Sequence, residues 1–399
     1  MASMLNIASF MGNKNKTDPD AEKTLLTMWA AKDSDTKTHC LCVRWAPDDS
    51  VLAAGCGDGI VRLFGPDGRL KERLGSPPAQ TGAGAFSILT EKDPVMAMRF
   101  QPNRENKLLL RVATADGEIN LFDLKTKQAK ATIQEKDKMN GDKPNQTLAM
   151  DISEDGQTWA TGGADRCVRI YNINDTKGLK VKELRGTMSD PGHSNRICAV
   201  RLNPQKPGIV ASAGLDGTVR LWDHRSSSPA PFAKITDVAV SGDALDFNGQ
   251  MLLTGSWRPT QQLQLWDIRS PETFRGVPWK KRAPPKVGAG KWSSVRDAVK
   301  GSTNLYGAMF VGGSGPLAGG IIAGGTAGKE LKVFSPAKLE GLNTADGVTP
   351  QPIANLKVPS GVHGLHVNTD GTMIGVAAVD GTALGVKMPD YVPPSPRVS

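Results

Sequence analysis

Short apolar segments alternate with tight turns along most of the chain, and few stretches show the 3.6-residue spacing of an amphipathic helix. In the clearest unit, apolar segments at 197–202, 208–214 and 218–223 are separated by turn residues, the second pair by Asp216-Gly217. Asp-Gly favours a two-residue hairpin turn, because both central residues of that turn need a positive φ. This unit therefore predicts three antiparallel strands.

The same three-segment pattern recurs seven times between residues 40 and 387. Most spacings between units exceed the roughly 40–45 residues of a four-stranded propeller blade, so most units carry insertions. A repeat of this kind predicts an all-β, seven-bladed β-propeller in which each blade also has a fourth, outer strand. The third predicted strand of each unit ends at Phe64, Phe122, Tyr171, Trp222, Trp266, Phe334 and Val386.

Closure of the ring is expected to come from the N-terminal part of the chain. Residues 388–390, which follow the last unit, have poor strand composition, whereas residues 24–29 have good strand composition. We therefore expect 24–29 to pair as the outer strand of the last blade, which removes an open sheet edge. The predicted organisation is an N-terminal extension (1–23), a propeller (24–388) with a basic insertion at 273–303, and a proline-rich tail (389–399).

The segments Leu221-Trp222-Asp223 and Leu265-Trp266-Asp267 make the repeat more specific. The chain resembles the WD-repeat β-propeller family over about residues 25–387. In one blade the resemblance implies a structural tetrad whose members form a hydrogen-bonded network across the strands: His193, Ser212, Asp216 and Trp222. Other units depart from the family pattern, and the seventh ends in Val386-Lys387 instead of Trp-Asp.

The resemblance implies a non-enzymatic scaffold that holds several proteins at once in a multiprotein assembly. Residues 252–258 and 277–279 are similar to WD-repeat proteins of flagellated protists, which favours a cytoskeletal assembly such as the axoneme of a cilium or flagellum. The five cysteines are an odd and scattered set, as in proteins of a reducing compartment. No apolar run approaches the roughly 20 residues that span a bilayer. We therefore expect a cytoplasmic protein without a membrane partner.

The formal net charge of +9 is concentrated in one insertion. Residues 280–300 contain seven basic residues and one acidic residue, a local charge of +6. One interpretation is a solvated loop; the other is a docking arm for an acidic protein surface, such as that of a microtubule, or for nucleic acid in a ribonucleoprotein. The candidate contact residues are Trp279, Lys280, Lys281, Arg282, Lys286, Lys291, Trp292, Arg296 and Lys300.

Two successive units carry Trp-Asp-x-Arg, ending in Arg225 and Arg269. This pattern resembles the box of substrate receptors of cullin–RING ubiquitin ligases, in which the arginine contacts the adaptor. The alternative is that each arginine lies on the blade and pairs with a nearby acid. A ligase receptor is thus a second functional hypothesis.

The sequence predicts no catalytic, cofactor or metal site. Ser212, His193 and Asp216 have the composition of a hydrolytic triad, but no nucleophile elbow is present. The glycine-rich residues 312–329 do not match the phosphate-loop pattern. Cys40 and Cys42 alternate along a predicted strand and are expected to share one face, either as buried apolar residues or as a metal or redox pair.

Overall fold

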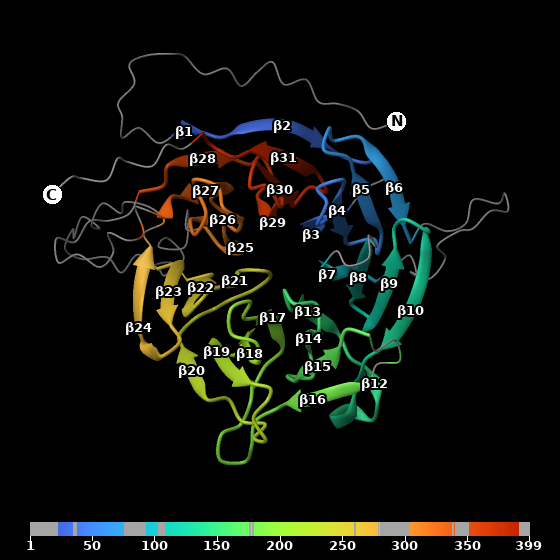
Figure 1. Cartoon of the computed structure of the whole chain (residues 1–399), viewed down its shortest axis with the longest axis vertical. Helices are drawn as coiled ribbons and strands as arrows, with labels where there is room; N and C mark the ends of the chain where they lie inside the picture. Colours follow the sequence, from blue (N-terminus) through green and yellow to red (C-terminus); the bar gives the residue numbers. More distant parts are fainter. Residues whose placement is uncertain are drawn as a thin grey trace, which may run out of the picture.

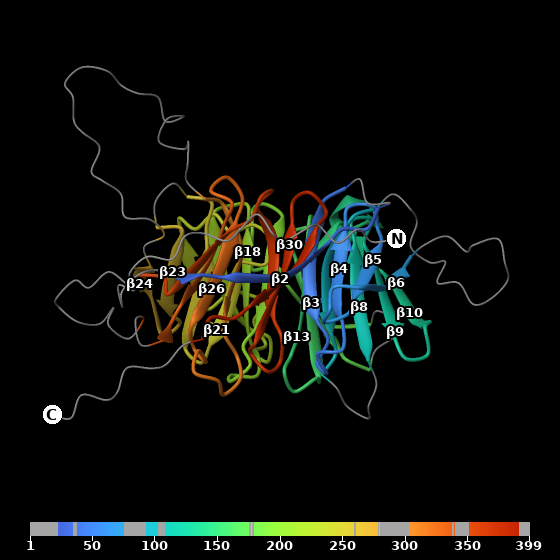
Figure 2. The ribbon, with the colours of Figure 1, turned by 90° about the horizontal axis from the view of Figure 1, so that it is seen from above.

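The computed structural model describes residues 23–34, 38–75, 93–102, 108–174, 177, 179–258, 261–277, 279, 303–336, 339 and 351–390. Six four-stranded sheets and one five-stranded sheet are arranged around a central axis, as Figure 1 shows. From the side the molecule is a disc whose strands run between two faces (Figure 2). The predicted all-β, seven-bladed propeller is confirmed.

Each blade contains three antiparallel strands in chain order and an outer fourth strand. Blades 1 to 4 consist of β3 (Cys40–Trp45), β4 (Leu52–Cys56), β5 (Val61–Phe64) and β6 (Leu70–Leu74); β7 (Val95–Phe100), β8 (Leu109–Thr114), β9 (Glu118–Asp123) and β10 (Gln128–Gln134); β13 (Thr147–Ile152), β14 (Thr158–Gly163), β15 (Val168–Asn172) and β16 (Lys180–Leu184); β17 (Ile197–Leu202), β18 (Ile209–Gly214), β19 (Thr218–Asp223) and β20 (Ala233–Thr236).

Blades 5 to 7 follow the same plan, and blade 7 takes its outer strand from the N-terminal part of the chain. They consist of β21 (Leu245–Asn248), β22 (Met251–Gly255), β23 (Leu263–Asp267) and β24 (Ser270–Val277); β25 (Leu305–Phe310), β26 (Ile321–Gly325), β27 (Glu330–Phe334) and β28 (Ala354–Lys357); β29 (Val362–Val367), β30 (Met373–Ala378), β31 (Ala383–Lys387) and β2 (Leu26–Ala31). Between blades 2 and 3 lie β11 (Lys136–Asp137), the 3-10 turn η2 (Lys138–Asn140) and β12 (Lys143–Pro144).

The seven residues that end the predicted third strands occupy one equivalent position. In blade 1, Phe64 lies opposite Leu52; in blade 4, Trp222 lies opposite Val210. All seven of these side chains are at most 5% exposed. Trp222 packs in a cluster with Val168 and Ile170 of blade 3, so this position joins neighbouring blades. The repeat alignment drawn from sequence is therefore correct at its most informative position.

The N-terminal strand closes the ring as predicted. β2 pairs antiparallel with β31 and becomes the outer strand of blade 7. Just before it, β1 (Lys23–Thr24) pairs in parallel with β28 of blade 6, and the Leu25 amide donates to the Asn355 carbonyl at 2.7 Å. The Trp29 indole N–H donates to the Pro66 carbonyl of blade 1 at 2.8 Å. One segment thus ties three blades together, whereas the sequence indicated only one.

A β-bulge near the start of the first strand recurs in six blades. In blade 1 it lies between Cys40 and Cys42, so that Leu41 is the extra residue. The bulge breaks the alternation of side chains. Cys40 therefore packs towards blade 7 and Cys42 towards blade 2. The expectation that both share one face is wrong for this reason.

The two faces of the disc are defined here by the turns they carry. The upper face holds the turns between second and third strands, such as Asp216-Gly217, and the starts of the first strands. The lower face holds the turns between first and second strands and the ends of the third strands, such as Asp223. This assignment follows from the antiparallel order of strands within each blade.

Candidate functional site

The structure brings the four predicted tetrad side chains of blade 4 into one chain of hydrogen bonds. The Trp222 indole N–H donates to Ser212 Oγ at 2.8 Å, and Ser212 Oγ lies 2.8 Å from His193 Nε2. His193 Nδ1 lies 3.0 Å from an Asp216 carboxylate oxygen. Burial acts to raise the pKa of Asp216, but the hydrogen bonds and charge of His193, with the Ser194 amide and the Thr218 hydroxyl, together outweigh it and hold that pKa below its ordinary value. Because Ser212 and Trp222 are fully buried, this arrangement is a tie between strands.

We expect Ser212→Ala to lower the free energy of unfolding by about 2 kcal/mol, since it leaves the Trp222 N–H and the His193 ring without their shared partner. Trp222→Phe, which keeps the ring and removes one donor, should cost about 1 kcal/mol. Urea unfolding of both variants and of the double variant measures their coupling. Additive losses would show that the four groups do not act as one network. Ser50→Ala, at a surface hydroxyl bonded to Asp48, is the control and should change little.

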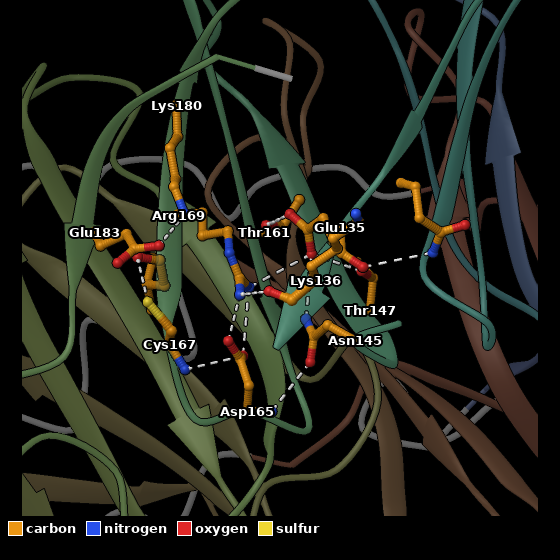
Figure 3. A network of polar contacts seen from close by, with 12 residues as sticks. Glu135, Lys136, Asn145, Thr147, Thr161, Asp165, Cys167, Arg169, Lys180 and Glu183 are labelled. Carbon is orange, nitrogen blue, oxygen red and sulfur yellow. Dashed lines mark hydrogen bonds and ion pairs between the residues drawn. The ribbon is translucent and has the colours of Figure 1, made fainter. Parts of the chain in front are cut away.

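Blade 3 has a different network, built around the buried carboxylate of Glu135 (Figure 3). Glu135 precedes β11 and enters the blade at the place where blade 4 has its histidine. Its oxygens accept from Thr161 Oγ1 at 2.5 Å, from Thr147 Oγ1 at 2.6 Å and from Tyr171 Oη at 2.6 Å. Burial, together with the charge of Glu135, raises the pKa of Tyr171. Three strands of the blade, β13, β14 and β15, therefore share one carboxylate.

A cation compensates this buried charge. Arg169 Nη1 lies 3.6 Å from Glu135 Oε2, and the same guanidinium pairs with the fully buried side chain of Asp165. Arg185 reaches Asp165 at 3.1 Å from the outer side of the blade. Burial raises the pKa of the neighbouring Cys167 thiol to about 12, so this cysteine stays protonated and unreactive. The network is structural, and sequence reasoning missed Glu135 because it lies in the connection between two units.

The bulged residues form a ring at the upper mouth of the central channel. Because each follows the same register, they face the axis at one level, and a cavity there is lined mainly by their side chains. Blade 5 departs from the apolar or neutral character of this upper ring by carrying Asp243 at the equivalent position. The upper ring consists of Leu41, Met96, Leu148, Cys198, Asp243, Tyr306 and His363.

Three residues further along each first strand, a second and mostly charged ring lies below the first. Arg99 bridges Asp151 and Asp243, each at 2.8 Å, and Arg201 bridges Asp151 at 3.1 Å and Asp246 at 2.9 Å. Asp151 also accepts from the Leu202 amide at 2.9 Å. This lower ring consists of Arg44, Arg99, Asp151, Arg201, Asp246, Met309 and His366.

Asp243 supplies the missing negative charge of this layer. The lower ring holds three arginines and two aspartates, and Arg44 pairs with Asp243 from the ring above. Burial lowers the pKa of Arg44, and the positive charges of the neighbouring Arg99 and Arg201 lower it further. The ion pairs link blades 1 to 5 across the channel, so the cavity at the upper mouth has a charged, electrically balanced floor.

Aromatic side chains continue outward from this mouth across the upper face. The Trp257 and Tyr306 rings lie 4.8 Å apart, the Tyr306 and His363 rings 5.1 Å, and the His363 and His39 rings 5.6 Å. They come from blades 5, 6, 7 and 1 in turn. Burial lowers the pKa of His363, so its ring is neutral near pH 7. These four residues are called the aromatic arc below.

The basic insertion leaves the propeller at Trp279, which is only 3% exposed. Its indole N–H donates to Glu330 Oε2 at 3.0 Å, and the Lys332 ammonium donates to its carbonyl at 2.8 Å. Trp279 thus stabilises the junction of blades 5 and 6 and offers no surface to a partner, which corrects the interpretation from sequence. The other candidate residues, Lys280, Lys281, Arg282, Lys286, Lys291, Trp292, Arg296 and Lys300, lie outside the described residues.

Both ends of the insertion lie on the upper face. Trp279 contacts the start of β27 through Glu330. On return, the Asn304 carbonyl accepts from the Thr326 amide at 3.0 Å, in the turn between β26 and β27. The insertion therefore starts and ends on the face that carries the aromatic arc.

The sequence profile of the WD domain, G-beta repeat family matches residues 32–65, 140–172 and 183–223, which cover the three inner strands of blades 1, 3 and 4. These three blades carry WD repeats, and the chain folds as a seven-bladed β-propeller. Blades 2, 5, 6 and 7 lie outside the match, although their strands keep the same order.

Known proteins similar to this WD-repeat chain have varied names. It is 25% identical to the protein transport protein sec13 of Emericella nidulans, over 55% of this chain and 70% of that protein. It is 30% identical to the zebrafish activating molecule in BECN1-regulated autophagy protein 1B, over 34% of this chain and 9% of that protein. It is 32% identical to small ribosomal subunit protein RACK1 of Drosophila melanogaster, over 23% of this chain and 30% of that protein. The matches thus span less than a third of the latter two relatives.

In this WD-repeat propeller, Arg225 and Arg269 occupy the same place on the lower face of blades 4 and 5. Each is well exposed, and each pairs with the aspartate two residues before it: Arg225 with Asp223 at 3.1 Å and Arg269 with Asp267 at 2.6 Å. The two arginines do not by themselves form a new site, because the charge of each is already neutralised by its own aspartate.

Within the part of the chain that the structure describes, no helix is long and apolar enough to cross a membrane. Among these same residues, no group of three or more His, Cys, Asp or Glu side chains is arranged to hold a metal ion.

Proposed function

We propose that this WD-repeat propeller is a non-enzymatic scaffold that binds other proteins on its upper face within a multiprotein assembly. The observation that carries the proposal is the upper channel mouth, where apolar side chains surround a cavity and the aromatic arc extends from it. Propellers built from WD repeats are generally protein-interaction modules, which supports the proposal.

The chemistry of the mouth favours uncharged side chains of a protein partner. Leu41, Met96 and Leu148 supply an apolar wall, and the floor of ion pairs is balanced and so attracts neither sign of charge. Trp257 is 36% exposed at the end of the aromatic arc. Exposed tryptophan and tyrosine are the residue types that most often dominate the energy of protein interfaces.

The basic insertion gives the same face a second contact, for an acidic partner. Its local charge of +6 and the position of both its ends support this reading. Microtubule surfaces are acidic, and we propose a cytoskeletal assembly of the cytoplasm, the axoneme of a cilium or flagellum, as the setting. Attraction between exposed charges of this kind weakens as salt concentration rises.

Cosedimentation of the full chain with polymerised microtubules tests this setting. We expect saturable binding that weakens about tenfold when the seven cations of 280–300 are replaced by glutamine, because charge steering and contact are lost together. Replacing Lys71, Lys130 and Lys234 in the same way is the control, since these lysines lie on outer strands away from the upper face. An equal loss per charge removed in both variants would show that net charge alone explains the effect.

The contribution of the upper face itself is measured with Trp257→Glu. Cross-linking mass spectrometry in the native source should show partner contacts around 257 and 306 that decrease at least about fivefold in this variant, because a carboxylate disrupts an apolar contact. Partner contacts confined to the lower face would contradict the proposal.

The alternative role as substrate receptor of a cullin–RING ubiquitin ligase rests on the two exposed arginines of the lower face. This role requires that a ligase adaptor co-purifies with the chain in stoichiometric amount and no longer does so with the Arg225→Ala, Arg269→Ala double variant. A ribonucleoprotein scaffold instead requires RNA binding that falls steeply with salt and depends on residues 280–300.

A further inference from the structure

The outer strands of the blades carry one outward residue at an equivalent position. In blades 1, 2, 3 and 7 this residue is the bulge of the outer strand, and in blade 4 it is the residue whose amide donates to Leu221. It is a lysine in blades 1 and 2 but apolar in the other three. The five residues are Lys71, Lys130, Val181, Phe232 and Met28.

Within this set of five, the apolar residues of blades 3 and 4, Val181 and Phe232, are more exposed than Met28 of blade 7. Val181 is 66% exposed and Phe232 52%, and Leu179, which precedes β16, is 70% exposed. Exposed large apolar side chains that are neighbours in space indicate an interaction surface, whereas single ones need no explanation.

The connection between β19 and β20 makes these residues parts of one surface. The Lys182 ammonium on β16 donates to the Ser226 carbonyl, and the Gly186 amide donates to the Pro229 carbonyl at 3.1 Å. Residues 226–231, Ser-Ser-Ser-Pro-Ala-Pro, carry no charge and lead directly to Phe232. An uncharged strip therefore runs along the rim from β16 of blade 3 to the start of β20 of blade 4.

The charges beside this strip are mainly positive. Lys180, Lys182 and Lys234 stand on β16 and β20, and the acid among the residues of these two strands is Glu183, which pairs with Lys180. A partner with carboxylates next to its apolar residues complements this pattern. The bulge at Val181 disturbs the edge of β16, and bulges of edge strands oppose the addition of a further strand. Recognition through side chains is therefore favoured over backbone pairing.

We propose that Leu179, Val181 and Phe232, with the uncharged residues 226–231 between them, form a docking surface for a partner protein. The partner contributes an acidic segment whose apolar side chains contact Val181 and Phe232. This rim surface is separate from the upper face, so the proposal can be tested independently of the function proposed above.

Site-specific photocrosslinking in the native source tests the proposal. A photoreactive amino acid is placed at position 181 or 232 of the full chain, and at position 28 as the matched control on blade 7. Met28 is 46% exposed and holds the equivalent position on another outer strand. We expect positions 181 and 232 to cross-link to the same segment of one partner, with a net negative charge and apolar residues, and position 28 not to do so.

The segment found is then synthesised and its affinity for the purified full chain is measured by fluorescence anisotropy. Val181→Lys with Phe232→Lys should weaken binding at least about tenfold, whereas Met28→Lys should leave it unchanged. Circular dichroism of each variant excludes misfolding. The proposal is overturned if positions 181 and 232 give no adduct, if they give only RNA or a second copy of this chain, if the segment is basic, or if the double variant binds normally.

Discussion

Glu135→Ala should destabilise the propeller more than any other single change within blade 3, by about 3–5 kcal/mol. The substitution removes the acceptor shared by Thr161, Thr147 and Tyr171, and it leaves Arg169 with an uncompensated part of its buried charge. Buried donors that lose their partner cost their full desolvation energy. The midpoint of urea unfolding, followed by tryptophan fluorescence, measures the loss.

Two further variants separate the network from general effects of mutation. Glu135→Gln keeps an acceptor oxygen in the same place and should lose clearly less stability than the alanine variant. Glu183→Ala removes a carboxylate of the same blade that is about a quarter exposed and pairs with Lys180, so we expect a change of at most about 1 kcal/mol. If Glu135→Ala proves as mild as Glu183→Ala, Glu135 does not hold the blade together.

Asp151→Asn in the channel should have an effect of similar size, about 3–5 kcal/mol. Asp151 is 7% exposed at its side chain and neutralises Arg99 and Arg201 at the same time. The amide preserves the shape and removes the charge, which leaves three arginines facing two aspartates in the channel. We expect a lower urea midpoint and faster proteolysis, because separate blades open more easily.

This variant should also change the response to acid. Burial acts to raise the pKa of Asp151, but Arg201, Arg99 and the Leu202 amide together outweigh it and hold the pKa below its ordinary value. A carboxylate with a depressed folded pKa contributes stability above its unfolded pKa of about 3.9 and loses it as the pH falls towards the folded value. The wild type should therefore lose more stability than Asp151→Asn between about pH 5 and pH 3. Parallel curves for the two proteins would refute the role of this charge.

The sequence predicted the blades because their information is local. The residue that ends each third strand, such as Phe64 or Trp222, packs between blades wherever it occurs, so its repetition reveals the fold without any partner being known. The closing strand was also predictable, because a propeller with a missing outer strand needs one and residues 24–29 had suitable composition.

The polar networks were not predictable to the same extent. Arg44, Arg99 and Arg201 do recur at one position of the repeat, which was a usable signal. Their partners, however, come from other blades, and Asp243 belongs to a different ring altogether. Trp279 was assigned to the surface because basic residues follow it, whereas its partner Glu330 lies 51 residues later in the chain. Sequence neighbours cannot show such contacts.

The way in which the ring closes determines the order in which the protein folds during synthesis. During synthesis β2 leaves the ribosome before every blade, whereas its partner β31 leaves after six of them. The first blades have short local connections and can fold as they emerge, but blade 7 stays incomplete, with the edge of β31 unpaired, until β2 and β31 meet. Closure is thus a late step that depends on the early segment having stayed available. A partner that bound residues 23–31 during synthesis would delay closure of the ring until it released them.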